Sequence, residues 1–177
     1  MHKIVAALIA ILIATPAHSE GSNTYLLAEY GAAAYSNMSP FPNPGKLGFG
    51  LGYMANDKAG IELGYTMFGD STLFVGANHA TVSASSFHPA IVTLVPLTPQ
   101  FNLLAKVGMA MNKAEAKSNL GAFASTSRTS LYYALGAQIN VSPQVGVRLQ
   151  YENFGNFEDA TAPMSASAFT GSVVLNF

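Results

Sequence analysis

Five ionisable residues lie in segments whose other residues are mostly small or apolar, and they could form a network of ion pairs. They are Glu29, Glu62, Lys106, Arg148 and Glu152, three acids and two bases. Each falls on the polar side of a segment that alternates between apolar and polar residues. If that side is enclosed, its charges are costly unless they are paired and hydrogen-bonded. We therefore expect Lys106 and Arg148 to bridge these carboxylates. Glu62 and Glu152 are the expected partners, with Glu29 as a further candidate.

A second group of residues could support nucleophilic catalysis. His79 and His88 lie near Ser83, Ser85 and Ser86, and a serine hydrolase needs a serine activated by a histidine that a carboxylate orients. The sequence places no Asp or Glu to orient His88. We therefore interpret both histidines as loop or rim residues and expect no enzyme activity. Two imidazoles are also too few for a convincing metal site, and no cofactor is expected.

The composition restricts the environment of the chain. Of its 177 residues, 50% are hydrophobic and only 10% are charged, which is less charge than a water-exposed surface normally carries. A net charge of -1 gives no electrostatic case for nucleic acid. The absence of cysteine excludes disulfides and thiolate metal sites. Something other than water is expected to surround part of the protein.

The N-terminus has the pattern of a secretory signal peptide. A short basic start precedes an apolar run from Ile4 to Ala14, and small residues follow from Ala17 to Ser19. The apolar run is far shorter than the roughly 20 residues that span a bilayer as a helix. We expect a signal peptide at residues 1–19, with cleavage after Ser19 or alternatively after Ala17. The folded domain is expected at residues 20–177.

Eight segments show the period-two alternation of strands with two unlike faces. In "KAGIELGYTMF", Ile61 and Leu63 fall on one face and Glu62 on the other. The fourth segment contains Pro89 and Pro96, each of which removes a ladder donor, so a bulge or an irregular rim is expected there. The expected strands are 24–36, 46–56, 58–69, 80–97, 100–112, 129–142, 144–154 and 167–177.

The connections between these segments alternate in length. Tight turns follow the second, fourth and sixth segments, and longer loops follow the others: "NMSPFPNPG", "DSTLFVGANH", "KAEAKSNLGAFASTS" and "GNFEDATAPMSA". This asymmetry is typical of outer-membrane barrels. The polar face is rich in Gly, Ser, Asn and Gln, which suits a cramped interior, and the apolar face suits lipid. The sequence therefore predicts an all-β fold, an eight-stranded antiparallel up-and-down transmembrane β-barrel.

Three stretches resemble the OmpA-like eight-stranded outer-membrane barrels. They are the hairpins "IVTLVPLTPQFNLLAKVGMAMNKAEA" and "YYALGAQINVSPQVGVRLQYENFGNF" and the closing strand "GSVVLNF". The resemblance covers essentially the whole mature chain and implies ion pairs inside the barrel. It also implies that the terminal Phe177 is part of the signal read by the barrel assembly machinery. Nothing follows Phe177, so we expect no peptidoglycan-binding periplasmic domain. The chain has no tryptophan, so an interfacial girdle would consist of Tyr and Phe.

The expected function is that of an integral protein in the outer membrane of a Gram-negative bacterium, with a structural or surface-interaction role. Expected partners are outer-membrane lipids and lipopolysaccharide, and a host or environmental ligand that would bind the long extracellular loops. The charged residues are expected to fill the lumen. Two alternatives remain open: a narrow, gated, porin-like pore, or an enzyme that modifies lipid A.

Overall fold

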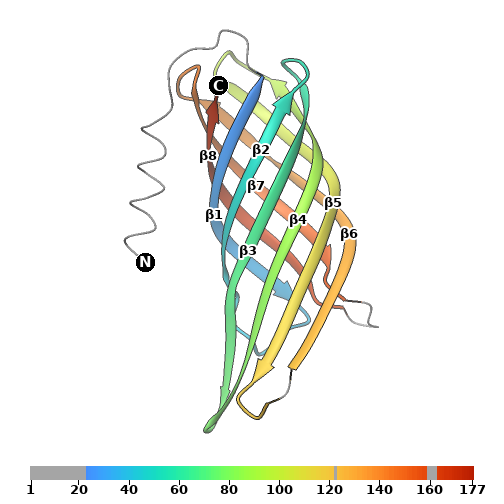
Figure 1. Cartoon of the computed structure of the whole chain (residues 1–177). Coiled ribbons are helices and arrows are strands. Elements are labelled where there is room, and N and C mark those ends of the chain that lie inside the picture. Colours follow the sequence, from blue (N-terminus) through green and yellow to red (C-terminus); the bar gives the residue numbers. More distant parts are fainter. Residues whose placement is uncertain (1–22, 122, 159–162) are drawn as a thin grey trace.

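The chain forms a closed barrel of eight antiparallel strands, each paired with its neighbours in sequence order. The computed structural model describes residues 23–121, 123–158 and 163–177, and Figure 1 shows the strands winding around one axis. The expected signal peptide lies outside these residues. The strands are β1 (Thr24–Ser36), β2 (Gly45–Met54), β3 (Ala59–Val75), β4 (Asn78–Pro96), β5 (Phe101–Ser118), β6 (Phe123–Asn140), β7 (Val145–Asn156) and β8 (Ser165–Asn176). The predicted fold class is confirmed.

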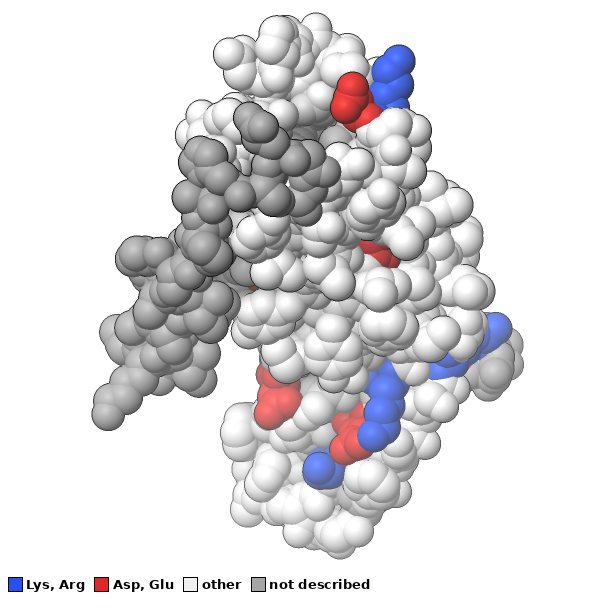
Figure 2. All heavy atoms as spheres, turned by 45° about the horizontal axis from the view of Figure 1, so that its top comes forward, with Lys and Arg blue, Asp and Glu red and all other residues white. Residues whose placement is uncertain are grey.

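The two faces of each strand are arranged as the alternation predicts. Leu63 is 45% exposed on the outside of β3, whereas its neighbour Glu62 is 2% exposed inside the barrel. The same arrangement holds for Leu149, 56% exposed, and Arg148, 1% exposed, on β7. Charged side chains lie mainly toward the two ends of the face shown in Figure 2, and most of its middle carries none. Water would not favour such an exterior, but hydrocarbon does. In the part of the chain that is described, no helix is long and apolar enough to cross a membrane.

The sheet closes through the last strand. β8 pairs with β1 and with β7, and the backbone N–H of Phe177 donates to the carbonyl oxygen of Thr24 at 3.0 Å. The end of the chain is therefore part of the hydrogen-bonded barrel. A closed sheet leaves no strand edge in lipid, where an unpaired backbone group is costly.

Two of the four predicted long loops are wrong. β3 and β4 are separated only by residues 76–77, and β5 and β6 only by residues 119–122. Figure 1 shows these two hairpins reaching well beyond the other strands. We call the barrel end from which they project the hairpin end, and the opposite end the short-turn end. The prediction failed because polar residues were read as loop, although Lys113, Glu115 and Lys117 alternate with alanines at the strand period.

The irregularity of β4 is limited to a gap in its pairing with β5. β4 runs without interruption to Pro96, although its pairing with β5 skips His88 and Pro89. Pro89 lacks the N–H that a ladder needs, but the register on either side is unchanged. Register shifts occur instead in β3, between Phe68 and Ser71, and in β7, between Asn153 and Gly155. Each accommodates one extra residue. The prediction of a bulge in the fourth strand is therefore wrong.

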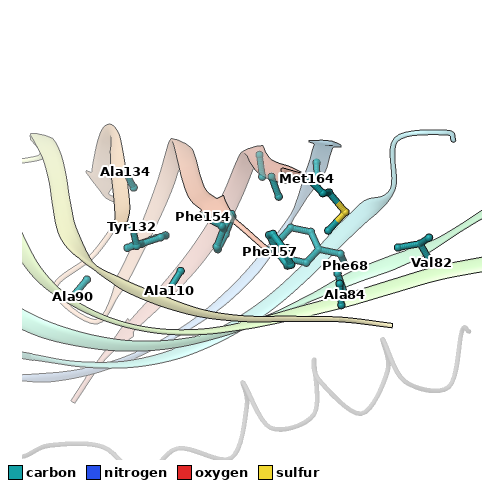
Figure 3. Packing of buried hydrophobic residues seen from close by; sticks show 14 residues of the cluster. Phe68, Val82, Ala84, Ala90, Ala110, Tyr132, Ala134, Phe154, Phe157 and Met164 are labelled. Atoms are coloured by element: carbon teal, nitrogen blue, oxygen red, sulfur yellow. The ribbon is translucent and has the colours of Figure 1, made fainter. Parts of the chain in front are cut away.

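The interior of the barrel is filled in layers. Two clusters of buried residues fill the interior near the short-turn end. One consists of Val92, Leu94 and Leu104, and the other of Tyr25, Leu27 and Val174. Toward the hairpin end, aromatic rings follow one another along the axis, as Figure 3 shows for Tyr132, Phe154, Phe157 and Phe68. The charged residues lie between these layers, because Arg148 lies over the Tyr25 ring and Lys46 over the Phe154 ring.

Candidate functional site

Glu62 is the centre of one group of buried charges, which we call the Glu62 cluster. Its carboxylate accepts hydrogen bonds from Lys106 Nζ at 2.5 Å and from Arg148 Nη1 at 2.7 Å. The Tyr25 hydroxyl donates to the same carboxylate at 2.7 Å, and Arg148 Nε donates to Gln138 Oε1 at 2.6 Å. The cluster therefore connects β1, β3, β5, β6 and β7 across the lumen.

Lys46 is the centre of a second group, the Lys46 cluster. Its Nζ donates to Glu29 Oε2 at 2.9 Å and also pairs with Glu152. The hydroxyls of Tyr132 and Thr170 each donate to Glu152 at 2.7 Å. Charge-assisted bonds of this kind are stronger than those between neutral groups. Because Glu152 accepts from three side chains, most of the hydrogen bonding that it loses on leaving water is replaced.

All five residues expected in the interior lie there, but their partners differ from the prediction. Glu29, Glu62, Lys106, Arg148 and Glu152 are each at most 4% exposed. Lys106 and Arg148 both pair with Glu62, as expected. The described ion pairs of Glu29 and Glu152, however, are with Lys46 and not with Lys106 or Arg148. The expected bridges from those two bases to Glu152 and Glu29 are therefore wrong.

Lys46 is the interior residue that the sequence prediction missed. It is 1% exposed and is the second residue of β2, in which Gly48, Gly50 and Gly52 alternate with larger apolar residues. Since Lys46 shares its face with these glycines, the period of β2 places it inside. That signal was present in the sequence. Lys46 was missed because it lies directly after a predicted loop.

The two clusters compensate each other in charge. The Glu62 cluster holds two cations and one carboxylate, a formal charge of +1, and the Lys46 cluster holds one cation and two carboxylates, a formal charge of -1. Buried charges are stable only when paired and hydrogen-bonded. Together the six residues sum to zero, which is the condition for enclosing them in a narrow lumen.

His88 lies inside the barrel, so its interpretation as a loop or rim residue is wrong. It is 3% exposed, its ring stacks on Tyr132 with centroids 4.6 Å apart, and its Nε2 lies 3.1 Å from Thr66 Oγ1. On β4, His88 shares the inward face with Ser86 and Ala90. An inward histidine cannot act on a lipid at the outer surface.

His79 lies near the tip of the β3–β4 hairpin, where its ring contacts Phe74 at 5.8 Å between centroids. Ser83 is on the same face but four residues away, about 13 Å along a strand, and its hydroxyl donates to Asp70. His79 therefore cannot activate Ser83. Among the residues that the structure describes, no group of three His, Asp or Glu side chains is placed to hold a metal ion.

The comparison with protein families identifies the barrel. A family model described as "Outer membrane protein beta-barrel domain" matches residues 4–177. The chain belongs to this family. Among curated proteins, Outer membrane protein A of Escherichia coli O157:H7 is 24% identical over 164 residues, which are 89% of this chain and 47% of that protein. Outer membrane protein A of Salmonella typhi is 25% identical over 168 residues, 89% of this chain and 48% of that protein. The chain spans about half the length of these relatives.

Solved outer-membrane barrels share the fold. Neisserial surface protein A has a TM-score of 0.70 at 16% identity, over 89% of this chain and all of that one. Ail of Yersinia pestis, solved with the heparin analogue sucrose octasulfate, has a TM-score of 0.66 at 16% identity and the same coverage. The outer-membrane enzyme PagL has a TM-score of 0.53 at 13% identity, over 86% of this chain and 99% of that one. At these identities the likeness extends to the architecture alone.

Proposed function

We propose that this member of the family is a non-catalytic outer-membrane barrel with a closed lumen, and that its projecting hairpins interact with partners at the cell surface. The filled interior supports the proposal that the lumen is closed. The largest fully buried side chains include Arg148, Tyr132, Lys46, Phe154 and Phe157, which come from β2, β6, β7 and the segment after β7 and meet inside the barrel. Eight-stranded barrels have lumens just wide enough for side chains to fill.

We also propose that the protein is exported and assembled in the outer membrane as its sequence predicts. Residues 1–19 would be removed during export, the barrel assembly machinery would read the end of β8 at Phe177, and the short-turn end would face the periplasm, as is usual for such barrels. The apolar exterior would contact outer-membrane lipids and lipopolysaccharide. Fractionation with the outer membrane, together with faster migration of unheated than of boiled protein on a detergent gel, tests this. Protein that stays in solution after detergent-free extraction would contradict it.

A barrel with a closed lumen should not conduct ions. Planar-bilayer recordings of the wild-type protein should show no steady conductance, because the side chains of the two charge clusters and the aromatic rings fill the interior. The variants Arg148→Ala and Glu62→Ala remove parts of the Glu62 cluster and would show whether a path opens. Steady conductance in the wild type would favour the narrow pore instead.

The projecting hairpins support a surface role. Among the described pairings, β3 pairs with β2 only as far as Phe68, and β6 pairs with β7 only from Tyr133 to the short-turn end. Beyond these points β3, β4, β5 and β6 continue past the barrel as a sheet. Its β3 edge has no strand partner among the described residues, whereas side chains on the β6 edge donate to the backbone carbonyls of residues 156–158. An unpaired strand edge such as that of β3 can bind an added strand of another protein.

Shortening the β5–β6 hairpin tests the surface role. Replacement of Glu115–Ser125 by an Asn-Gly turn would join Ala114 to Thr126, which are partners across the hairpin. We expect the shortened protein to keep its heat-dependent mobility shift, because its membrane-embedded pairing is unchanged. Cells that display it should lose adhesion to host-cell monolayers relative to cells that display the full chain. Unchanged adhesion would leave a structural role in the membrane as the better account.

A further inference from the structure

The exterior of β4 and β5 changes abruptly from apolar to polar at one level, and that of β6 changes one residue pair earlier, between Leu131 and Thr129. Phe87 on β4 is paired with Met111 on β5, and both side chains are exposed, at 40% and 47%. Residues two positions further along a strand lie about 7 Å nearer the hairpin end on the same face. At that next level the outward residues are Ser85 on β4, Lys113 on β5 and Ser127 on β6. On β4 and β5 the apolar band ends at this level, whereas on β3 the exposed Met67 continues it.

Lys113 is flanked by hydroxyls from both neighbouring strands. The register pairs Lys113 with Ser85 on one side and with Ser127 on the other. Directly opposed residues have Cβ atoms about 5 Å apart, so an ammonium and two hydroxyls face outward within one small area. These are the donors that bind a phosphate group at protein surfaces.

The next residues of β5 on the same face complete a charged strip. Glu115 Oε1 lies 2.8 Å from Lys113 Nζ, and Glu115 Oε2 lies 3.5 Å from Lys117 Nζ. The side chains of Lys113 and Lys117 are 58% and 66% exposed. Hydrogen bonding to Lys113 lowers the pKa of the Glu115 carboxyl, which favours the carboxylate that pairs with both lysines. The formal charge of the strip is +1, and each ammonium keeps N–H donors for an outside ligand.

We infer that the row Ser85–Lys113–Ser127, with Lys117 beyond it, binds the phosphate of an outer-leaflet lipid whose acyl chains lie against Phe87 and Met111. This inference rests on the proposed function, because it requires the apolar band to lie in the outer membrane with the hairpins outside. The polar row lies directly next to the apolar surface, and this favours a lipid as the ligand. A free anion would use only the polar row, whereas a phosphorylated lipid also buries its chains on the apolar surface directly below.

The position of the row within the membrane supports this assignment. Lysine near a bilayer interface is attracted to anionic headgroups over a distance of about a Debye length. Tyr65, which is 46% exposed, pairs with Phe87 on the neighbouring strand, so aromatic side chains lie at the level just below the row. Aromatic rings favour the interface between hydrocarbon and headgroups. The phosphates are therefore expected at the height of Lys113.

Native mass spectrometry of the refolded full chain in a neutral detergent tests the site. Bis-phosphorylated lipid A is titrated into wild-type protein and into Lys113→Gln. Lys58→Gln is the matched control, because Lys58 is an exposed lysine at the short-turn end. We expect Lys113→Gln to weaken lipid A binding about fivefold, the factor that corresponds to one lysine at a charged membrane surface. Lys58→Gln should bind as the wild type does.

Three further measurements complete the test. Lipid A without phosphates should show no difference between wild type and Lys113→Gln, and millimolar inorganic phosphate should not displace phosphorylated lipid A. Glu115→Gln removes the competing carboxylate and should tighten binding. Equal binding by wild type and Lys113→Gln, equal losses in the two lysine variants, or displacement by inorganic phosphate would each overturn the inference. A chain that shows no heat-dependent mobility shift would instead contradict the proposed function.

Discussion

Arg148 Nη1 lies 2.7 Å from Glu62 Oε2, and this contact connects two strands on opposite sides of the barrel. Arg148 belongs to β7 and Glu62 to β3, which are separated by three strands in either direction around the closed sheet. The pair therefore spans the lumen. Gln138 and Tyr25 hold its two ends in place. A cross-lumen contact of this kind fixes which residues face each other and hence the register of the whole sheet.

Neutralising Glu62 should destabilise the barrel strongly. In Glu62→Gln, Lys106 and Arg148 stay buried without their carboxylate, and breaking a buried ion pair costs about 3–5 kcal/mol. The measurement is urea unfolding of protein folded into lipid vesicles, followed by the mobility shift. Glu115→Gln on the projecting hairpin is the control, and its midpoint should match the wild type. Equal midpoints for the two variants would contradict the role assigned to the Glu62 cluster.

Removing Lys46 should be partly corrected by removing one of its acids. Lys46→Met leaves Glu29 and Glu152 buried without the cation that pairs with both. The uncompensated charge should cost about 3–5 kcal/mol. Adding Glu152→Gln to Lys46→Met should restore part of that loss, because it removes one unpaired carboxylate. A double-mutant cycle from unfolding midpoints measures the effect. Strictly additive losses would mean that the two residues do not interact.

The sequence was sufficient to predict that the five charged residues named from it face the lumen, because the strand period determines the face wherever a strand is recognised. Leu63 and Glu62 alternate so regularly that no tertiary information was needed. The partners of the buried charges could not be predicted in the same way. Whether Glu152 meets Lys46 or Lys106 depends on how far neighbouring strands are staggered around the barrel, and that stagger is a property of the closed sheet.

The length of the hairpins was also beyond the prediction. Alanine, lysine and glutamate are depleted in strands, so the run from Lys113 to Lys117 resembles loop by composition. In the structure these residues are held by pairing with β4 and β6. His88 was misread for a related reason, since the neighbouring Pro89 suggested an irregular segment. Tertiary pairing overrode the local preference in both places.

A side chain at Gly64 should collide with His88. A Cβ atom added to Gly64 would lie 2.0 Å from His88 Cε1, and the ring cannot move freely because it stacks on Tyr132. Gly64→Ala should therefore destabilise the barrel by about 1–3 kcal/mol, the usual cost of overfilling a packed interior. In a His88→Ala background the same substitution should cost much less. Equal costs in both backgrounds, measured by urea unfolding, would show that the contact is not responsible.

A charge on the outside of the barrel should distinguish lipid from water as the surrounding medium. Leu135 is 60% exposed and lies in the apolar band of β6, whereas Leu120 is 74% exposed between the projecting strands β5 and β6. Leu135→Arg should lower the stability in lipid vesicles by about 2–4 kcal/mol if its position is near the midplane. Leu120→Arg should change it by less than about 0.5 kcal/mol, as is usual for surface positions. The two leucines are almost equally exposed, so a soluble barrel would tolerate both arginines equally. Only a bilayer around the middle of the strands makes the first substitution costly while the second remains neutral.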